Sequence, residues 1–466
     1  MAWGRGLASS VRISLRIYIQ VFIEVLFVGK NYVGTSKENT LKENLNKGLP
    51  PLSDPFSPLV LMSIFSFFGF VGVLFFVTFS HPEGVKTLRI LSVTYAEVLL
   101  AFGFFLVYYL FWFFGYIASR KSIPRGGFFY FSVGRKVSSE VSAIIFFVLI
   151  LMFWISYKFH PAADNAFRSS LTSGSYGMFF FFLMTFTLAF FGVFTAKLFA
   201  DNKISVLAPG SWSISVVSWA FGVFFLALVV YSLGGRGRVV SIFIVAVAVW
   251  HYYVRPIGVV RLQIYAVAAI CVIIFMPVIA NSEHYAHQSI WSSLWGVENG
   301  RTFDGLYNLT RIINWWSEHG VWGYPGELLV GDVSGDLGIS GLTNTRDVVM
   351  LEVYGKSEYS AGFPATKPGE LLLNFGLIGV PVGAIILGYI SGKLYYTCVV
   401  NKVFGFSSIP IYIMVLMRTG IASPLGYFGQ NLVMSATIFF VSIFIWVVFF
   451  GGYRIRRAKK SFLTKP

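Results

Sequence analysis

The chain has 466 residues and a formal net charge of +16, yet only 12% of its residues are charged and 56% are hydrophobic. A soluble chain carries about 25% charged residues, so this composition excludes a soluble globular protein. The basic residues lie in short loops between apolar segments and in the C-terminal tail, as the positive-inside rule requires. We therefore expect an all-α polytopic membrane protein, and no nucleic-acid partner.

Ten apolar segments meet the requirement for a membrane helix, which is about 20 mostly apolar residues. They cover 58–80, 92–118, 141–158, 176–199, 212–233, 239–254, 262–280, 371–391, 409–427 and 430–450. Residues 11–28 are also apolar but carry one polar stripe at i, i+4 spacing, formed by Arg12, Arg16, Gln20 and Glu24. The stripe predicts a helix that lies at the membrane interface, with an eleventh span as the alternative.

Lysine and arginine are concentrated in the C-terminal tail, which is therefore predicted to be cytoplasmic. Counting back from it gives ten spans with both termini inside the cell. The predicted parts are a cytoplasmic N-terminal segment with the interfacial helix (1–57), spans one to seven (58–280), a large external loop (281–369), spans eight to ten (370–450) and a basic cytoplasmic tail (451–466).

The external loop 281–369 differs in composition from the rest of the chain. It holds ten acidic and five basic residues, a net charge of −5 in a chain of +16. Apolar residues at helical spacing predict an amphipathic helix over 304–319, and the glycine-rich stretch 331–341 is predicted to be an irregular loop. A connection of this length usually has a function.

The sequence Gly-Gly-Arg-Gly-Arg at 234–238 follows the predicted fifth span at its outer end. Glycines allow a ligand to approach the backbone closely, and Arg236 and Arg238 offer paired donors suited to a phosphate or diphosphate. The alternative is that both arginines only reach the lipid headgroups. The predicted topology places these arginines on the outer face of the membrane, where basic residues are usually rare. Their presence there favours the functional interpretation.

A second motif, Pro-Ala-Thr-Lys-Pro-Gly-Glu-Leu-Leu-Leu-Asn-Phe-Gly-Leu-Ile-Gly at 364–379, lies where the loop returns to the membrane. Lys367 and Glu370 are expected at the water boundary, with Asn374 one turn below Glu370 on the same helical face. A carboxylate there could accept a proton or bind a sugar hydroxyl. Alternatively, Glu370 only favours the start of the helix through the macrodipole.

Arg418 lies inside the predicted ninth span. An ionised side chain in the membrane interior is costly and is a functional candidate by default, with structural pairing to an acid as the alternative. The loop histidines His284 and His287 have no third ligand placed by the sequence, so no metal site is predicted, and no cofactor is expected.

The paired Arg-Gly sequence at 234–238, the large loop and the Pro-Gly-Glu-Leu-x-x-Asn-Phe-Gly-x-x-Gly motif that opens the next span resemble the bacterial O-antigen polymerases (Wzy type). The layout covers most of the chain, whereas the motifs cover about 234–238 and 364–380. The related O-antigen ligases usually show a histidine where the loop returns. This chain has Lys367-Pro368-Gly369-Glu370 there, which favours a polymerase over a ligase.

The resemblance implies a membrane glycosyltransferase of GT-C-like architecture in the bacterial inner membrane, with 281–369 as a periplasmic loop. Such an enzyme transfers a growing glycan from undecaprenyl diphosphate to the distal sugar of a new undecaprenyl-diphosphate-linked repeat unit. The implied partners are these lipid-linked oligosaccharides, membrane lipid and a chain-length regulator. The departing diphosphate needs fixed cations, for which the candidates are Arg236, Arg238, Arg301, Arg311, Lys367 and Arg418.

The acceptor hydroxyl needs a base or an orienting acceptor, and the two candidate carboxylates are Glu370 and Glu352. With Arg236 they form the predicted catalytic set. The main alternative function is a flippase or other transporter of lipid-linked oligosaccharides, which also needs charge in its interior but has little use for so long an external loop. A ligase of the same architecture and a scaffold that sets chain length remain further alternatives.

Overall fold

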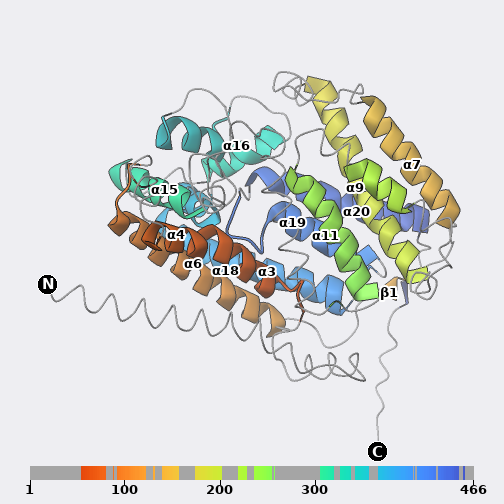
Figure 1. Cartoon of the computed structure of the whole chain (residues 1–466), viewed down its shortest axis with the longest axis horizontal. Helices are drawn as coiled ribbons and strands as arrows, with labels where there is room; N and C mark the ends of the chain where they lie inside the picture. The colour runs from red at the N-terminus through yellow and green to blue at the C-terminus, as the bar shows by residue number, and fades with distance from the viewer. Residues whose placement is uncertain are drawn as a thin grey trace, which may run out of the picture.

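The computed structural model describes fewer residues than the full chain. These are 54–79, 88, 92–121, 130–131, 139–156, 174–201, 219–227, 236–253, 257, 305–319, 326–336, 342–355, 366–401, 403–404, 407–426, 429–450 and 455–456. In this part the regular secondary structure is helical except for one short antiparallel ladder, in which β1 (Tyr130–Phe131) pairs with β2 (Ile455–Arg456). Figure 1 shows the helices gathered side by side in one bundle.

Most of the described apolar helices overlap the predicted spans. The helices are α3 (Pro58–Ser66), η2 (Phe67–Val71), α4 (Gly72–Phe79), α6 (Tyr95–Lys121), α7 (Ser139–Ser156), α9 (Gly174–Asp201), α11 (Arg236–Tyr253), α15 (Gly305–His319), α16 (Glu327–Asp336), α17 (Thr345–Val348), η3 (Val349–Val353), α18 (Lys367–Tyr395), η4 (Tyr396–Val400), α19 (Ser408–Thr419), α20 (Gly429–Ile445) and η6 (Trp446–Phe450). A further helical stretch covers 219–227. The predicted span 262–280 and the predicted interfacial helix 11–28 lie outside the described residues.

Three described helices are long and apolar enough to cross a membrane, namely Pro58–Phe79, Tyr95–Ser119 and Lys367–Val400. Shorter apolar helices are present at Val141–Met152, Leu183–Phe199, Ile242–Tyr253 and Ser435–Ile445. Large apolar side chains such as Ile144, Ile378 and Phe440 are more than 60% exposed. Apolar surface of this kind is expected where helices face lipid, and the fold is that of a helical membrane protein.

Helices α6 and α18 pack closely along their lengths (Figure 1) because small residues line the contact. A β-carbon at Gly388 would lie 1.9 Å from the Trp112 carbonyl oxygen, and one at Gly392 would lie 2.0 Å from the Ser119 hydroxyl oxygen. The sequence Gly388-x-x-x-Gly392 therefore acts as a small-residue seam, the arrangement that membrane helices use for close approach.

We expect Gly388→Ala to lower the thermal stability of the protein in detergent, because the new methyl group collides with the α6 backbone and forces the two helices apart. Gly103→Ala on α6 is the matched control, since a β-carbon there has no heavy atom within 4 Å. That change should be neutral or stabilise by up to about 1 kcal/mol, the helix-propensity difference. Equal unfolding temperatures for the two variants would show that the seam does not hold the pair.

Near the C-terminal end of α18, three tyrosine hydroxyls bind residues 54–56, which precede α3. Asp54 is buried and accepts hydrogen bonds from the Tyr252 hydroxyl at 2.7 Å and the Tyr395 hydroxyl at 2.5 Å. The Tyr412 hydroxyl donates to the Phe56 carbonyl at 2.6 Å. Because the three tyrosines come from α11, α18 and α19, this cluster fixes where the chain enters the bundle.

Candidate functional site

Helix α18 is broken and doubles back near its start. The apolar stretch Lys367–Val400 has 34 residues, about 51 Å if straight, which exceeds the hydrocarbon core of about 30 Å. Gly376 has φ 66° and ψ −164°, a conformation open essentially only to glycine. After this break the second half returns past the first, so that a β-carbon at Gly383 would lie 2.4 Å from the Leu371 side chain.

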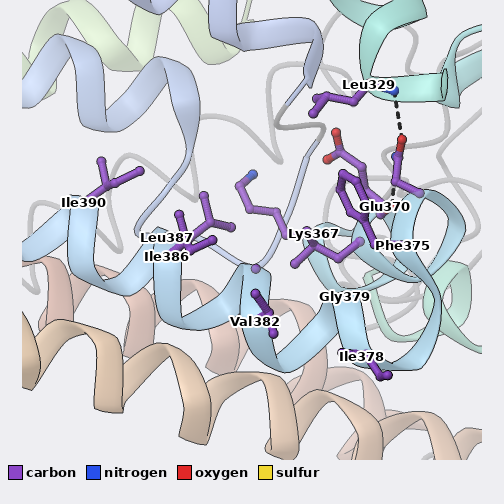
Figure 2. A pocket seen from close by; sticks show the side chains of 13 residues that line it. Leu329, Lys367, Glu370, Phe375, Ile378, Gly379, Val382, Ile386, Leu387 and Ile390 are labelled. Carbon is purple, nitrogen blue, oxygen red and sulfur yellow. Dashed lines mark hydrogen bonds between the residues drawn. The ribbon is translucent and has the colours of Figure 1, made fainter. Parts of the chain in front are cut away.

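The two halves of α18 enclose a cavity of about 400 Å³, which we call the α18 crook. Its walls come from both halves and from Leu329 of α16 (Figure 2). The first half supplies Lys367, Glu370, Leu371, Asn374 and Phe375, and the second supplies Ile378, Gly379, Val382, Gly383, Ile386, Leu387 and Ile390. A mostly apolar cavity of this size with a few converging polar groups is typical of a ligand site.

Beside the crook, the chain is unwound between α19 and α20. The predicted span 409–427 is wrong in its second half, because α19 ends at Thr419 and Gly420 takes the left-handed conformation with φ 55°. Glycine in this position commonly ends a helix, and a proline such as Pro424 prevents its continuation. Unwound backbone at membrane depth is tolerated only where protein groups bind its polar atoms. Here the Trp112 indole and the Ser391 hydroxyl both donate to the Ile421 carbonyl.

Lys367 binds the same unwound segment. Its side chain is 1% exposed, and its ammonium donates to the Leu425 carbonyl at 3.1 Å and to the Gly426 carbonyl at 3.3 Å. Its backbone N–H donates to the Pro424 carbonyl at 2.9 Å. Lys367 was expected at the water boundary, but the fold-back of α18 buries it within the bundle, on the wall of the crook.

Glu370 is also buried, at 3% exposure, and connects α18 to α20. Its Oε1 accepts a hydrogen bond of 2.7 Å from the Gly429 amide, at the first residue of α20. A carboxylate at a helix N-terminus is stabilised by the helix macrodipole. The Tyr108 hydroxyl lies within electrostatic range of this carboxylate, and no hydrogen-bond partner for that hydroxyl is found among the described residues.

Asn374 connects the wall of the crook to the start of α16. It lies one turn from Glu370 as predicted, and its amide donates to the Glu370 carbonyl at 3.0 Å. Its Oδ1 accepts from the Leu329 amide at 2.8 Å, the dashed line in Figure 2, and its backbone carbonyl accepts from the Gly326 amide at 3.0 Å. The start of α16 is thereby fixed to the broken part of α18.

Helix α16 overturns one prediction, because residues 331–336 of the supposed irregular stretch 331–341 are helical. The glycine at 331 serves packing rather than flexibility, since a β-carbon there would lie 1.9 Å from the Thr343 carbonyl oxygen. Asp332 is buried and accepts hydrogen bonds from the backbone and the hydroxyl of Thr345 at 3.0 and 2.6 Å. These contacts fix α16 to α17.

The predicted loop helix is confirmed as α15, Gly305–His319, and it packs on the first turn of α18. A β-carbon at Gly369 would lie 2.7 Å from the Ile312 side chain. Next to Ile312, the Arg311 guanidinium lies 4.7 Å from the centre of the Tyr354 ring. The exposed Glu352 is two residues before Tyr354 in η3. The structure thus brings Arg311 and Glu352 to one area of the segment that is predicted to be the external loop.

For the other predicted site residues, the structure describes only the backbone position or nothing. Arg236 and Arg238 lie in the first turn of α11, and Arg418 is the second-last residue of α19. Their side chains are outside the described residues, as is the whole of Arg301. Among the residues that the structure describes, no three His, Cys, Asp or Glu side chains are grouped as metal ligands.

The site therefore combines a buried ammonium, a buried carboxylate and a buried carboxamide on the wall of one cavity. Sequence reasoning missed Tyr108 and the unwound segment 420–426, although Gly420 and Pro424 were a readable helix-ending signal. Comparisons with protein-family models, with curated proteins and with solved structures found no match. The chemistry of the site is therefore the basis for assigning its function.

Proposed function

We propose that the chain is a polysaccharide polymerase of the O-antigen (Wzy) type, a GT-C-like membrane glycosyltransferase with ten spans in the bacterial inner membrane. It transfers a growing glycan from undecaprenyl diphosphate to the distal sugar of a new lipid-linked repeat unit at the periplasmic face. The observation that supports this most is the position of Lys367, Glu370 and Asn374. They line a cavity with exposed apolar walls, and the helix α15 packs directly against the same part of α18.

In the proposed reaction the acceptor hydroxyl oxygen bonds to the anomeric carbon of the donor glycan. The bond between that carbon and the diphosphate oxygen breaks, and its electron pair leaves with undecaprenyl diphosphate. Fixed cations favour this departure because negative charge develops on the leaving oxygen. Arg236 and Arg238 are candidates, since they lie in the first turn of α11. The macrodipole disfavours cations there, and a bound diphosphate would offset that cost.

The proton of the acceptor hydroxyl needs a base or an orienting acceptor. Glu370 is our first candidate, because its carboxylate is buried beside the crook and fixed by the Gly429 amide. Glu352 is the second, on the exposed surface of η3 near Arg311. Arg311, Arg301, Lys367 and Arg418 stay as candidate contacts to diphosphate or sugar.

A flippase or other transporter for lipid-linked oligosaccharides is the second candidate function. The break in α18 at Gly376 favours it, because transporters often place broken helices at their substrate sites. The large external loop and its ordered helices α15 and α16 favour the polymerase, which must hold two glycans outside the membrane.

Deletion of the protein in a host that makes such a glycan separates these functions. We expect the surface-glycan ladder to collapse to single repeat units that are still exported and still attached to their final carrier. Loss of a flippase would instead leave lipid-linked units on the cytoplasmic face, and loss of a ligase would leave long chains on undecaprenyl diphosphate. A gel of surface glycan beside the lipid-linked pool gives the readout, and a surviving ladder of altered length would contradict catalysis by this chain.

A further inference from the structure

One wall of the α18 crook is an exposed apolar ridge. Val382, Ile386 and Ile390 repeat at four-residue spacing on the second half of α18 and are 49%, 52% and 43% exposed. They extend for about 12 Å along the helix, and Figure 2 shows them following one another away from Lys367 and Glu370. The cavity therefore has a polar end and a single apolar track that opens sideways to the membrane.

The polar end holds a cation, the Lys367 ammonium, which also lies within electrostatic range of the Glu370 carboxylate. Two carbonyl oxygens, those of Leu425 and Gly426, accept hydrogen bonds from the Lys367 ammonium, which has three N–H groups. The Glu370 carboxylate accepts from the Gly429 amide at the start of α20, whose macrodipole offsets part of its negative charge. In the part of the chain that the structure describes, the Lys367 ammonium thus has one N–H that it does not donate to these two carbonyls, on the wall of the crook that also carries Glu370.

The shape of the crook restricts the apolar part of that ligand. The three exposed side chains of this ridge form a row on one helix face, and Leu329 of α16 lies at the polar end of the cavity. One chain can lie along such a ridge, whereas the two chains of a phospholipid would need a second track.

We infer that the α18 crook binds an anionic amphiphile with one apolar chain, which enters sideways from the membrane. The ammonium of Lys367 binds the anionic group, and the chain lies on Val382, Ile386 and Ile390. The choice of a polyprenyl diphosphate as this amphiphile rests on the proposed function. In that case the crook holds a lipid-linked substrate with its diphosphate at the Lys367 ammonium.

Binding to the purified full chain in detergent tests this site. The probes are undecaprenyl diphosphate, undecaprenol, which has the chain without the charge, and phosphatidylglycerol, which is anionic with two chains. Ile386→Trp should weaken binding of the first two probes at least ~10-fold, because the indole fills space that the chain needs. The matched control is Ile144→Trp on α7, which is 63% exposed and remote in sequence from the crook.

Glutamine keeps two N–H donors for the Leu425 and Gly426 carbonyls. At equal amounts of folded protein, Lys367→Gln should therefore weaken the binding of undecaprenyl diphosphate at least ~10-fold, the loss of a charge-assisted contact, and leave the binding of undecaprenol unchanged. Unchanged binding in Ile386→Trp, or displacement of undecaprenyl diphosphate by an equal amount of phosphatidylglycerol, would overturn the inference. Failure of the proposed function is a separate result: the variants would then show the predicted binding pattern, while deletion of the protein would leave the glycan ladder intact.

Discussion

Lys367→Met is expected to lower the unfolding temperature of the protein in detergent. Methionine is unbranched and only one atom shorter than lysine but donates no hydrogen bond, so the Leu425 and Gly426 carbonyls would lose the ammonium that binds them. A fully buried polar group without a partner costs about 1–3 kcal/mol. Because Leu425 and Gly426 are only partly buried, we expect a total loss of roughly 1–3 kcal/mol, against a total stability of about 5–15 kcal/mol.

Size-exclusion chromatography and the thermal unfolding midpoint give the readouts for this variant. Lys393→Met is the control, because Lys393 lies in the last turn of the same helix, is only half-buried and contacts the Tyr389 ring at 5.6 Å. Losing a cation–π contact of this kind costs about 0.5–1 kcal/mol. If Lys367→Met folds as well as this control, the segment 420–426 does not depend on the ammonium, and Lys367 serves the ligand alone.

Hydrophobicity and periodicity predicted the helices of the fold because both signals are local. The spans at 58–80 and 92–118 and the loop helix at 304–319 agree with the structure within a few residues. The apolar run from 371 to 391 gave no reason to expect a reversal, since Gly376 is one of several glycines in it. Its left-handed conformation depends on packing between Leu371 and Gly383, twelve residues apart, and no local pattern encodes that contact.

The candidate site was predicted in its residues but not in its arrangement. Lys367, Glu370 and Asn374 stood together in one motif, and the structure places all three on the crook. Their partners come from distant segments: Leu425 and Gly429 lie more than fifty residues away in sequence. Contacts of that range follow from how α18, α16 and α20 pack, so a single sequence shows the donors and acceptors without showing which of them meet.

Glu370→Gln is expected to lower the rate of repeat-unit joining at least ~100-fold, the usual contribution of a positioned base, while the protein folds and accumulates normally. Glutamine keeps an oxygen that can accept from the Gly429 amide at the position of the present 2.7 Å hydrogen bond, so the link between α18 and α20 survives. The negative charge is what is lost, and with it the ability to take the proton from the acceptor hydroxyl.

Two matched changes make this result specific to Glu370. Glu318→Gln alters an exposed acid of α15, outside the crook, and should leave joining unchanged. Glu352→Gln tests the competing carboxylate on η3. The measurement is the rate at which purified protein converts lipid-linked repeat units into longer chains, compared at equal amounts of folded protein. Normal joining in Glu370→Gln with loss in Glu352→Gln would move the base to the external loop, and would leave Glu370 as the residue that fixes the start of α20.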